Sequence, residues 1–102
     1  MSGIEKKAPI NGKGKEYILN TNKIIFEGEY INKKRSGKGI EYDEYGYVKF
    51  KGEYLNGKKN GKGKEYYNND LIFEGEYADG KKTGKGLNIM IIIKLNLKEN
   101  IN

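Results

Sequence analysis

Three short stretches of the chain alternate aromatic residues and glycine with charged residues. In the first stretch, Phe26, Gly28 and Tyr30 occupy every second position, and Glu27 and Glu29 lie between them. Side chains of a β-strand point alternately to its two faces, so this pattern predicts a half-buried strand. A glycine between two aromatic residues leaves room for a neighbouring ring to lie across the backbone. The same alternation returns at Phe50, Gly52 and Tyr54 and at Phe73, Gly75 and Tyr77, and it extends to Ile24, Val48 and Leu71 at the starts of the three stretches.

The three stretches are copies of one repeat. Phe26 and Phe50 are 24 residues apart and Phe50 and Phe73 are 23 residues apart, a period typical of stacked repeats. Each copy continues with Gly-Lys-Gly, which we interpret as the return strand of a hairpin. We expect a disordered lead-in at residues 1–11, a repeat array at 12–88 and an apolar tail at 89–102. Within the array, a half repeat covers 12–25 and full repeats lie near 26–49, 50–72 and 73–88.

The turn inside each repeat has a sequence typical of tight hairpins. Asn56-Gly57 in the second copy and Asp79-Gly80 in the third copy accept the positive φ that such turns require. The first copy has Asn32-Lys33 at this place. Because a lysine resists positive φ, we expect the first turn to differ from the other two.

The return strand and the connection after it are less regular. Strict alternation separates Gly61 and Gly63 from Tyr66, so these residues share a face only if a bulge intervenes. The connection between repeats shortens along the chain from nine to eight to seven residues, whereas the step across the turn inside each repeat is always seven. Exposed loops tolerate changes of length. A role that depends on shape is therefore expected at the turn of constant length.

The segment after Gly86 departs from the repeat. Leu87-Asn88-Ile89 replaces the expected Lys-Glu-Tyr, and residues 89–93 are all apolar. Two interpretations stay open. The tail is either a strand that caps the open edge of the last hairpin, or a truncated or frame-shifted end rich in residues that A/T-rich DNA encodes.

The composition narrows the chemistry that the chain can carry. Its 102 residues include no histidine and no cysteine, which excludes imidazole bases, thiolates, disulfides and the usual zinc sites. Gly57 and Gly61 have three residues between them, where a phosphate-binding loop requires four. Glu27 and Glu29 recur with the repeat, so we interpret them as a solvated face rather than an acid–base pair. We expect no enzyme, no catalytic residue, no metal and no cofactor.

The charge and the absence of targeting signals bear on location. The formal net charge is +6 at pH 7. We see no secretory signal and no apolar segment of the roughly 20 residues that a membrane span needs. The expected location is cytoplasmic, with a peripheral place at a membrane or the cytoskeleton as a further possibility.

Together, Phe-Glu-Gly-Glu-Tyr at 26–30, the Asn-Gly-Lys-Lys turn at 56–59 and Gly-Lys-Gly at 61–63 resemble the MORN repeat (membrane occupation and recognition nexus). The resemblance covers residues 12 to about 86. It implies an all-β fold in which about three and a half hairpin repeats stack into an elongated, single-layer antiparallel sheet. It also implies membrane or phospholipid attachment, homodimerisation and scaffolding, as in junctophilins, plant phosphatidylinositol phosphate kinases and cytoskeletal scaffolds of protists. The chain departs from many members by having tyrosine in place of tryptophan and an incomplete last repeat.

Basic residues gather at the turns of constant length. In stacked hairpins, equivalent turns would lie roughly 10 Å apart, close to the Debye length of about 8 Å, so their charges would reinforce one another. The candidate basic ridge consists of Lys33, Lys34, Arg35, Lys38, Lys58, Lys59, Lys62, Lys81, Lys82 and Lys85. We interpret it either as a site for anionic lipid or a partner, or as ordinary solvated turns. Glu16, Glu41 and Glu65 follow the Gly-Lys-Gly sequences and would partly neutralise it.

Three functions compete at this point. The first is a non-catalytic module for protein–protein interaction or scaffolding, which self-associates through its sheet face or open edges. The alternative is peripheral attachment to anionic phospholipid membranes through the lysine-rich turns. Nucleic acid ranks third, because the aromatic residues are expected in the core rather than as stacking platforms.

Overall fold

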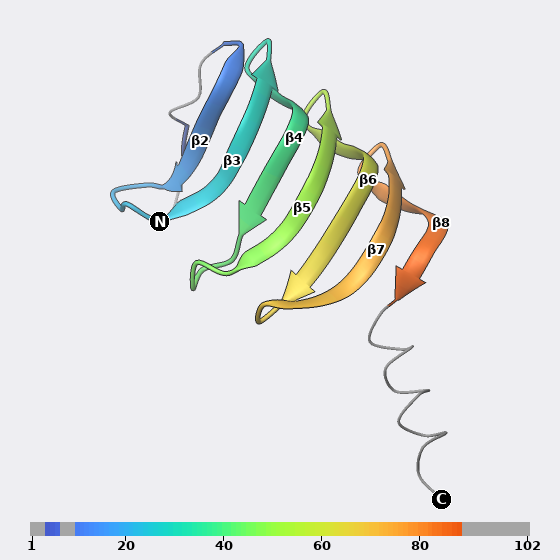
Figure 1. Cartoon of the computed structure of the whole chain (residues 1–102). Coiled ribbons are helices and arrows are strands. Elements are labelled where there is room, and N and C mark those ends of the chain that lie inside the picture. Colours follow the sequence, from blue (N-terminus) through green and yellow to red (C-terminus); the bar gives the residue numbers. More distant parts are fainter. Residues whose placement is uncertain (1–3, 7–9, 89–102) are drawn as a thin grey trace, which may run out of the picture.

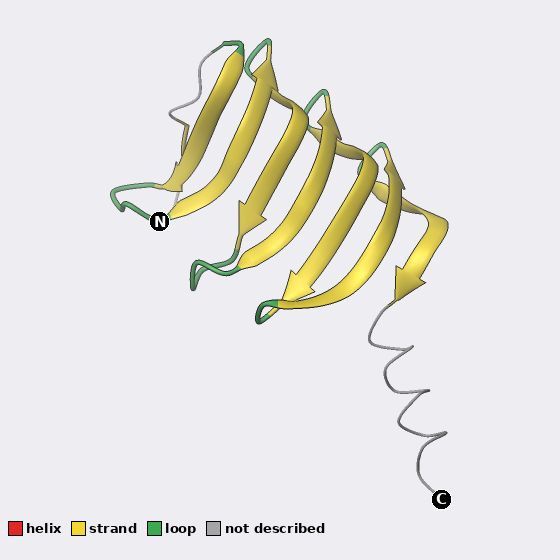
Figure 2. Ribbon diagram, in the orientation of Figure 1, coloured by secondary structure: helices red, strands yellow, loops and turns green. Residues whose placement is uncertain are grey.

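The computed structural model describes residues 4–6 and 10–88, which form one open antiparallel sheet (Figure 1). Every strand pairs with its neighbours in sequence, and the described part contains strands and turns without a helix (Figure 2). The strands are β1 (Ile4–Lys6), β2 (Gly12–Ile18), β3 (Ile24–Ile31), β4 (Lys34–Tyr42), β5 (Val48–Leu55), β6 (Lys58–Tyr67), β7 (Asp70–Ala78) and β8 (Lys81–Asn88). The predicted all-β sheet of stacked hairpins is confirmed. The predicted tail at 89–102 lies outside the described residues.

The lead-in contributes a strand of its own. β1 pairs with the second half of β2, with Ile4 opposite Ile18 and Lys6 opposite Glu16. The strand at residues 4–6 differs from the disorder expected for residues 1–11, of which residues 1–3 and 7–9 lie outside the described part. The outer backbone groups of β2 would otherwise lack partners on that side, and β1 supplies partners for three of its residues.

One face of the sheet, which we call the aromatic face, holds the core. Phe26, Tyr30, Phe50, Tyr54, Phe73 and Tyr77 form a single buried cluster. The ring of Phe26 packs edge to face against Tyr30 at 5.8 Å and against Tyr54 of the next repeat at 5.2 Å. The edge-to-face geometry suits the quadrupoles of the rings. The rings therefore join each repeat to the one that follows.

Glycines make room for these rings. Gly52 lies directly opposite Gly63 in the β5–β6 pair. A Cβ atom added to Gly52 would lie 2.8 Å from Cζ of Phe50 and 2.6 Å from the carbonyl oxygen of Lys62. Any side chain at this position would displace the ring or separate the strands.

A bulge near each turn redirects the return strand. Gly28 pairs with Gly39 and Tyr30 pairs with Arg35, so three residues of β4 lie opposite Glu29 alone. Gly37 within this bulge has a φ of 103°, a conformation that favours glycine. Arg35 comes before the bulge and lies opposite Tyr30, which places it on the aromatic face. Equivalent register shifts occur in the β5–β6 and β7–β8 pairs.

A second bulge follows between repeats. Glu16 pairs with Phe26 and Tyr17 pairs with Ile24, which leaves Ile25 as the additional residue. Directly opposite residues share a face of the sheet. Ile24 therefore lies on the face of Tyr17 and not on the face of Phe26. The expectation that Ile24, Val48 and Leu71 share the aromatic face is wrong, because Val48 and Leu71 likewise pair with Tyr42 and Tyr66 beyond a bulge.

The turn inside the first repeat does not differ from the others. Asn32 and Lys33 have φ values of 52° and 67°, close to the 50° and 87° of Asn56 and Gly57. The expectation of a different turn is therefore wrong. Lys33 adopts the left-handed conformation although it costs a lysine free energy.

Hydrogen bonds between repeats account for this uniformity. The N–H of Gly57 donates to the carbonyl of Arg35 at 2.8 Å, and the N–H of Gly80 donates to that of Lys59 at 2.9 Å. In the first repeat the N–H of Lys33 donates to the carbonyl of Ile10 at 2.9 Å. Each turn is thus attached at or just before the start of the strand that precedes its repeat, which explains its constant length.

The connections between repeats are stabilised by hydrogen bonds within each loop. In the β4–β5 loop, the carboxylate of Asp43 accepts the N–H groups of Tyr45 and Tyr47 at 2.9 and 3.0 Å. In the β2–β3 loop, the Thr21 hydroxyl donates to the Ile18 carbonyl at 2.8 Å. Because each of these loops forms hydrogen bonds within itself, loops of different length can connect the repeats.

Candidate functional site

Three of the basic residues predicted to form a ridge lie instead on the aromatic face. The guanidinium carbon of Arg35 is 4.0 Å from the ring centroid of Phe26. The ammonium nitrogen of Lys59 lies 4.2 Å from the Phe50 centroid, and that of Lys82 lies 4.1 Å from the Phe73 centroid. A cation over a ring face is attracted by the ring quadrupole. These cations cover the core of a sheet that has a single layer.

Glu16 balances the first of these cations. Its carboxylate is 2.8 Å from Nε and 3.0 Å from Nη2 of Arg35, and it accepts the Tyr30 hydroxyl at 2.7 Å. Glu16 is only 2% exposed. A buried carboxylate requires such partners, because an unpaired charge would be costly to desolvate.

The same arrangement recurs in the next two repeats. Glu41 accepts the hydroxyl of Tyr54 and lies 3.9 Å from the ammonium group of Lys59. Glu65 accepts the hydroxyl of Tyr77, and Lys82 lies 3.4 Å from it. The charges of the aromatic face are therefore paired with one another and serve the fold.

The pKa values of the tyrosines follow from this pairing. Burial raises the pKa of Tyr30, Tyr54 and Tyr77 above the ordinary value, and the adjoining carboxylates raise it further. Burial alone would lower the pKa of Arg35, but the hydrogen bonds and negative charge of Glu16 outweigh it, and the pKa is raised. At neutral pH the tyrosines are hydroxyl donors and Arg35 is a cation.

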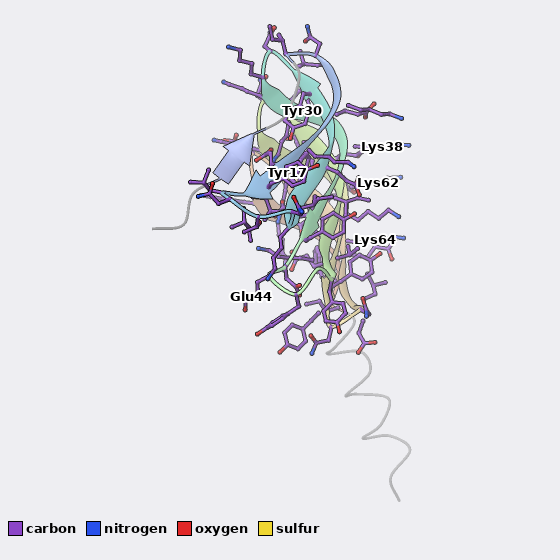
Figure 3. All side chains as sticks on the ribbon, turned by 90° about the vertical axis from the view of Figure 1, so that its left-hand side faces the viewer. Tyr17, Tyr30, Lys38, Glu44, Lys62 and Lys64 are labelled. Carbon is purple, nitrogen blue, oxygen red and sulfur yellow. The ribbon has the colours of Figure 1, made fainter. Side chains whose placement is uncertain are left out.

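The opposite face, the groove face, is hollowed across β2 to β6. The groove has a volume of about 1090 Å³, and Tyr17, Ile40 and Tyr66 contribute apolar surface to it. Lys38, Lys62 and Lys64 project from the same side of the sheet (Figure 3). The groove lysines are Lys13, Lys15, Lys38, Lys51, Lys62 and Lys64.

The three glutamates that line the groove are engaged within the sheet. Glu29 accepts the backbone N–H of Lys38, and Glu53 accepts that of Lys62, both at 2.7 Å. Glu27 accepts the hydroxyl of Tyr42. Burial, together with this hydrogen bond and the charge of Glu27, raises the pKa of Tyr42 to about 12.

The groove lysines have no comparable role. Among residues 4–6 and 10–88, no ion pair within 4 Å involves the ammonium group of any groove lysine. Lys51 and Lys64 are direct cross-strand partners, which places two like charges side by side. The groove therefore has an excess of lysines over glutamates, and within the described residues its ammonium groups form no ion pair at this distance.

The structure distributes the predicted basic ridge over three surfaces. Lys33, Lys34, Lys58 and Lys81 stay exposed at the turns, and Lys58 lies 3.3 Å from Asp79. Arg35, Lys59 and Lys82 cover the aromatic face, whereas Lys38 and Lys62 line the groove. The side chain of Lys85 lies outside the described part.

Four groove lysines were not predicted as site residues. Lys13, Lys15, Lys51 and Lys64 lie within strands rather than at turns. Their signal in the sequence is an alternation with the glycines, which places them on the face opposite the rings. Only the register shows that Lys51 and Lys64 meet across neighbouring strands, whereas Lys13 and Lys15 lie opposite Glu29 and Glu27.

Two other kinds of site are absent from the part of the chain that the structure describes. No cluster of three or more acidic, histidine or cysteine side chains suited to a metal ion occurs among the described residues. The same part of the chain has no helix long and apolar enough to cross a membrane.

Comparison with known families matches residues 26–44, 50–71 and 73–87 to the MORN repeat. A search of individual curated proteins gave no match.

Proposed function

Because the chain belongs to the MORN repeat family, we propose that it is a non-catalytic module that holds an acidic segment of a protein partner in its groove. MORN repeats are non-enzymatic modules that are generally involved in protein–protein or membrane interactions. The observation that carries the proposal is the contrast within the groove: the glutamates accept hydrogen bonds from the sheet, whereas in the described part of the chain the lysine ammonium groups form no ion pair within 4 Å.

The mixed charge of the groove favours a polypeptide over a nucleic acid. Across neighbouring strands, Lys13 lies opposite Glu29 and Lys38 lies opposite Glu53. A phosphate chain carries an evenly repeated negative charge and would meet these glutamates. A polypeptide can place its carboxylates at Lys51 and Lys64 and uncharged residues elsewhere. Such complementarity gives specificity as well as faster association.

The dimensions of the groove agree with an extended segment. Strands in a sheet lie about 4.8 Å apart, so a groove from β2 to β6 spans roughly 19 Å. An extended chain covers about 3.3 Å per residue, and about six residues would cross the groove. Tyr17, Ile40 and Tyr66 provide contacts for apolar side chains between the acidic ones.

The proposal is tested with a peptide of about ten alternating Glu and Val residues. At low salt we expect Lys51→Gln combined with Lys64→Gln to weaken binding about tenfold, which corresponds to about 1.4 kcal/mol. The matched control, Lys34→Gln with Lys81→Gln, removes the same charge at the turns and should change the affinity less than about twofold. Equal losses in both variants would show unspecific attraction. Tighter binding of oligothymidylate at the same lysines would favour nucleic acid.

A second candidate is attachment to anionic membranes through the turns of constant length. It is supported by exposed Lys33, Lys34, Lys58 and Lys81, which accompany Ile31 and Leu55 with exposed fractions of 56% and 52%. Basic and apolar side chains together suit the surface of an anionic bilayer. Co-sedimentation with phosphatidylserine vesicles tests it: Lys34→Gln with Lys81→Gln should reduce binding, and Lys51→Gln with Lys64→Gln should not.

A further inference from the structure

The large hydrophobic side chains that are exposed lie at the two ends of the strands. We define the tip rim as residues 10–11, 31–34, 55–58 and 78–81, and the loop rim as residues 19–23, 43–47 and 67–70. Figure 1 shows these sets at opposite ends of the sheet. Among the described residues, the large hydrophobics that are exposed are Ile10, Ile31 and Leu55 in the tip rim and Leu19, Tyr45, Tyr47 and Tyr67 in the loop rim. Within the same set of described residues, no exposed large hydrophobic lies on the aromatic face or in the groove.

The two rims carry opposite charge. The tip rim has four lysines and one carboxylate, that of Asp79, which lies 3.3 Å from Lys58. The loop rim has the carboxylates of Asp43, Glu44 and Asp70 and a single cation, Lys23. Figure 3 shows Glu44 at the loop end of the molecule.

The two rims also share a period. Both repeat once for every two strands, because each repeat contributes one turn and one loop. At about 4.8 Å between strands, successive turns and successive loops are both separated by roughly 10 Å. A tip rim therefore matches a loop rim in spacing over several repeats.

We propose that the tip rim of one copy of this chain docks on the loop rim of a second copy. Ile31 and Leu55 pack against the rings of Tyr45 and Tyr67, and lysines of the tip rim lie opposite Glu44 and Asp70. The contact is heterologous, so each copy keeps one rim available and the assembly continues in the direction of the strands. This inference is independent of the groove, which stays accessible in the assembly.

A second copy accounts for more of the surface than a membrane does. An anionic bilayer attracts the lysines of the tip rim but repels Glu44 and Asp70. It also leaves Tyr45 and Tyr67 exposed, with 77% and 69% of their surfaces in solvent. Docking between copies covers both rims through one kind of contact.

Sedimentation velocity at low salt over a range of protein concentrations tests the proposal. The tip-reversed variant is Lys34→Glu with Lys81→Glu, and the loop-reversed variant is Glu44→Lys with Asp70→Lys. We expect the wild type to form concentration-dependent assemblies and each variant alone to remain monomeric. An equimolar mixture of the two variants should assemble again, because acidic tips then meet basic loops. Circular dichroism verifies that these exposed substitutions leave the sheet intact.

Two further variants separate this contact from others. Lys51→Glu with Lys64→Glu alters the net charge as the tip-reversed variant does, and it should assemble like the wild type. Tyr45→Ser with Tyr67→Ser should weaken assembly about tenfold. A monomeric wild type, no recovery on mixing, or equal loss in the groove variant would each overturn the proposal. A monomer that binds phosphatidylserine vesicles through Lys34 and Lys81 would assign the tip rim to membranes. Glu–Val peptide binding by the tip- and loop-reversed variants reports on the groove separately.

Discussion

The two faces of this sheet are built from alternate residues of the same strands, yet their charges behave differently. On the aromatic face, Arg35 lies over a ring and forms an ion pair with Glu16. On the groove face, Lys51 and Lys64 lie side by side, and neither forms an ion pair within 4 Å with any residue that the structure describes. The comparison shows that one face supplies the packing of the fold. On the other face, which we propose for a partner, lysines lie opposite glutamates of neighbouring strands but form no ion pair within 4 Å in the described part of the chain.

The largest loss of stability is expected from a substitution on the aromatic face. Gly52→Ala should lower the free energy of unfolding by about 3 kcal/mol or more, because its Cβ would overlap Phe50 and the backbone of β6. Lys51→Ala, one residue away on the groove face, should change it by less than about 0.5 kcal/mol. Urea denaturation measures both. Similar losses in the two variants would contradict the division between the faces.

The next largest difference in stability is expected between substitutions of two carboxylates, Glu16 on the aromatic face and Glu53 on the groove face. Glu16→Gln should cost about 3 kcal/mol, because Arg35 would lose the charge that balances it in a largely buried place. Glu53→Gln keeps an oxygen that can accept the N–H of Lys62, and should cost about 0.5 kcal/mol. Thermal unfolding of both variants measures the difference. A smaller loss for Glu16→Gln than for Glu53→Gln would show that the buried pair is unimportant.

Alkaline pH should weaken the sheet. The pKa of Tyr42 rises from 10.0 to about 12 on folding, and those of Tyr30, Tyr54 and Tyr77 also rise. Above pH 10 the unfolded chain loses these protons first, so the folded state binds more protons and its stability falls as pH rises towards 12. Below pH 10 this contribution is fully present. Urea titrations from pH 8 to pH 12 measure the decline, which should be less steep in Tyr42→Phe.

A substitution in the turn of the first repeat should raise the stability of the fold, by a smaller amount than the losses above. Lys33→Gly should stabilise the fold by about 0.5–1 kcal/mol, because glycine adopts the φ of 67° without the cost that a lysine bears. The reverse substitution at the equivalent site, Gly57→Lys, should destabilise it by a similar amount. Differential scanning calorimetry distinguishes the two shifts. Destabilisation by Lys33→Gly would mean that the lysine side chain has a structural role.

The smallest change in stability is expected from substitutions of the groove lysines. Lys51→Gln with Lys64→Gln removes the repulsion between these neighbours and the attraction of Lys64 to Glu74, so stability should change by less than about 0.5 kcal/mol. The same urea measurements apply. A large loss of stability would indicate that these lysines hold the sheet together, and it would remove the basis for a binding groove.

The repeat and the use of its aromatic residues could be predicted from the sequence because they depend on a local period. Phe50, Gly52 and Tyr54 alternate within five residues, and strand geometry then places their side chains on one face. The hairpin turns at Asn56-Gly57 and Asp79-Gly80 are equally local. Lys33 was predicted less well, because the hydrogen bond from its N–H to Ile10 imposes the turn from another part of the chain.

The candidate site depends on register, which the sequence pattern does not contain. Arg35 and Lys38 were predicted as parts of one ridge, but strand alternation separates residues three apart, and the pairing of Arg35 with Tyr30 shows which face each one takes. Glu16 was predicted to reduce the charge of the turns, and the structure shows the pair with Arg35. The pairing of Lys51 with Lys64 becomes visible only when β5 and β6 are aligned.

The hydrogen bond from Gly57 to Arg35 also has a consequence for synthesis of the chain. Each turn attaches to a strand that lies closer to the N-terminus, so a hairpin leaving the ribosome finds its docking surface already made. Because all strand pairs are sequential, no contact in the sheet must wait for a distant segment. The array can therefore grow one hairpin at a time during translation.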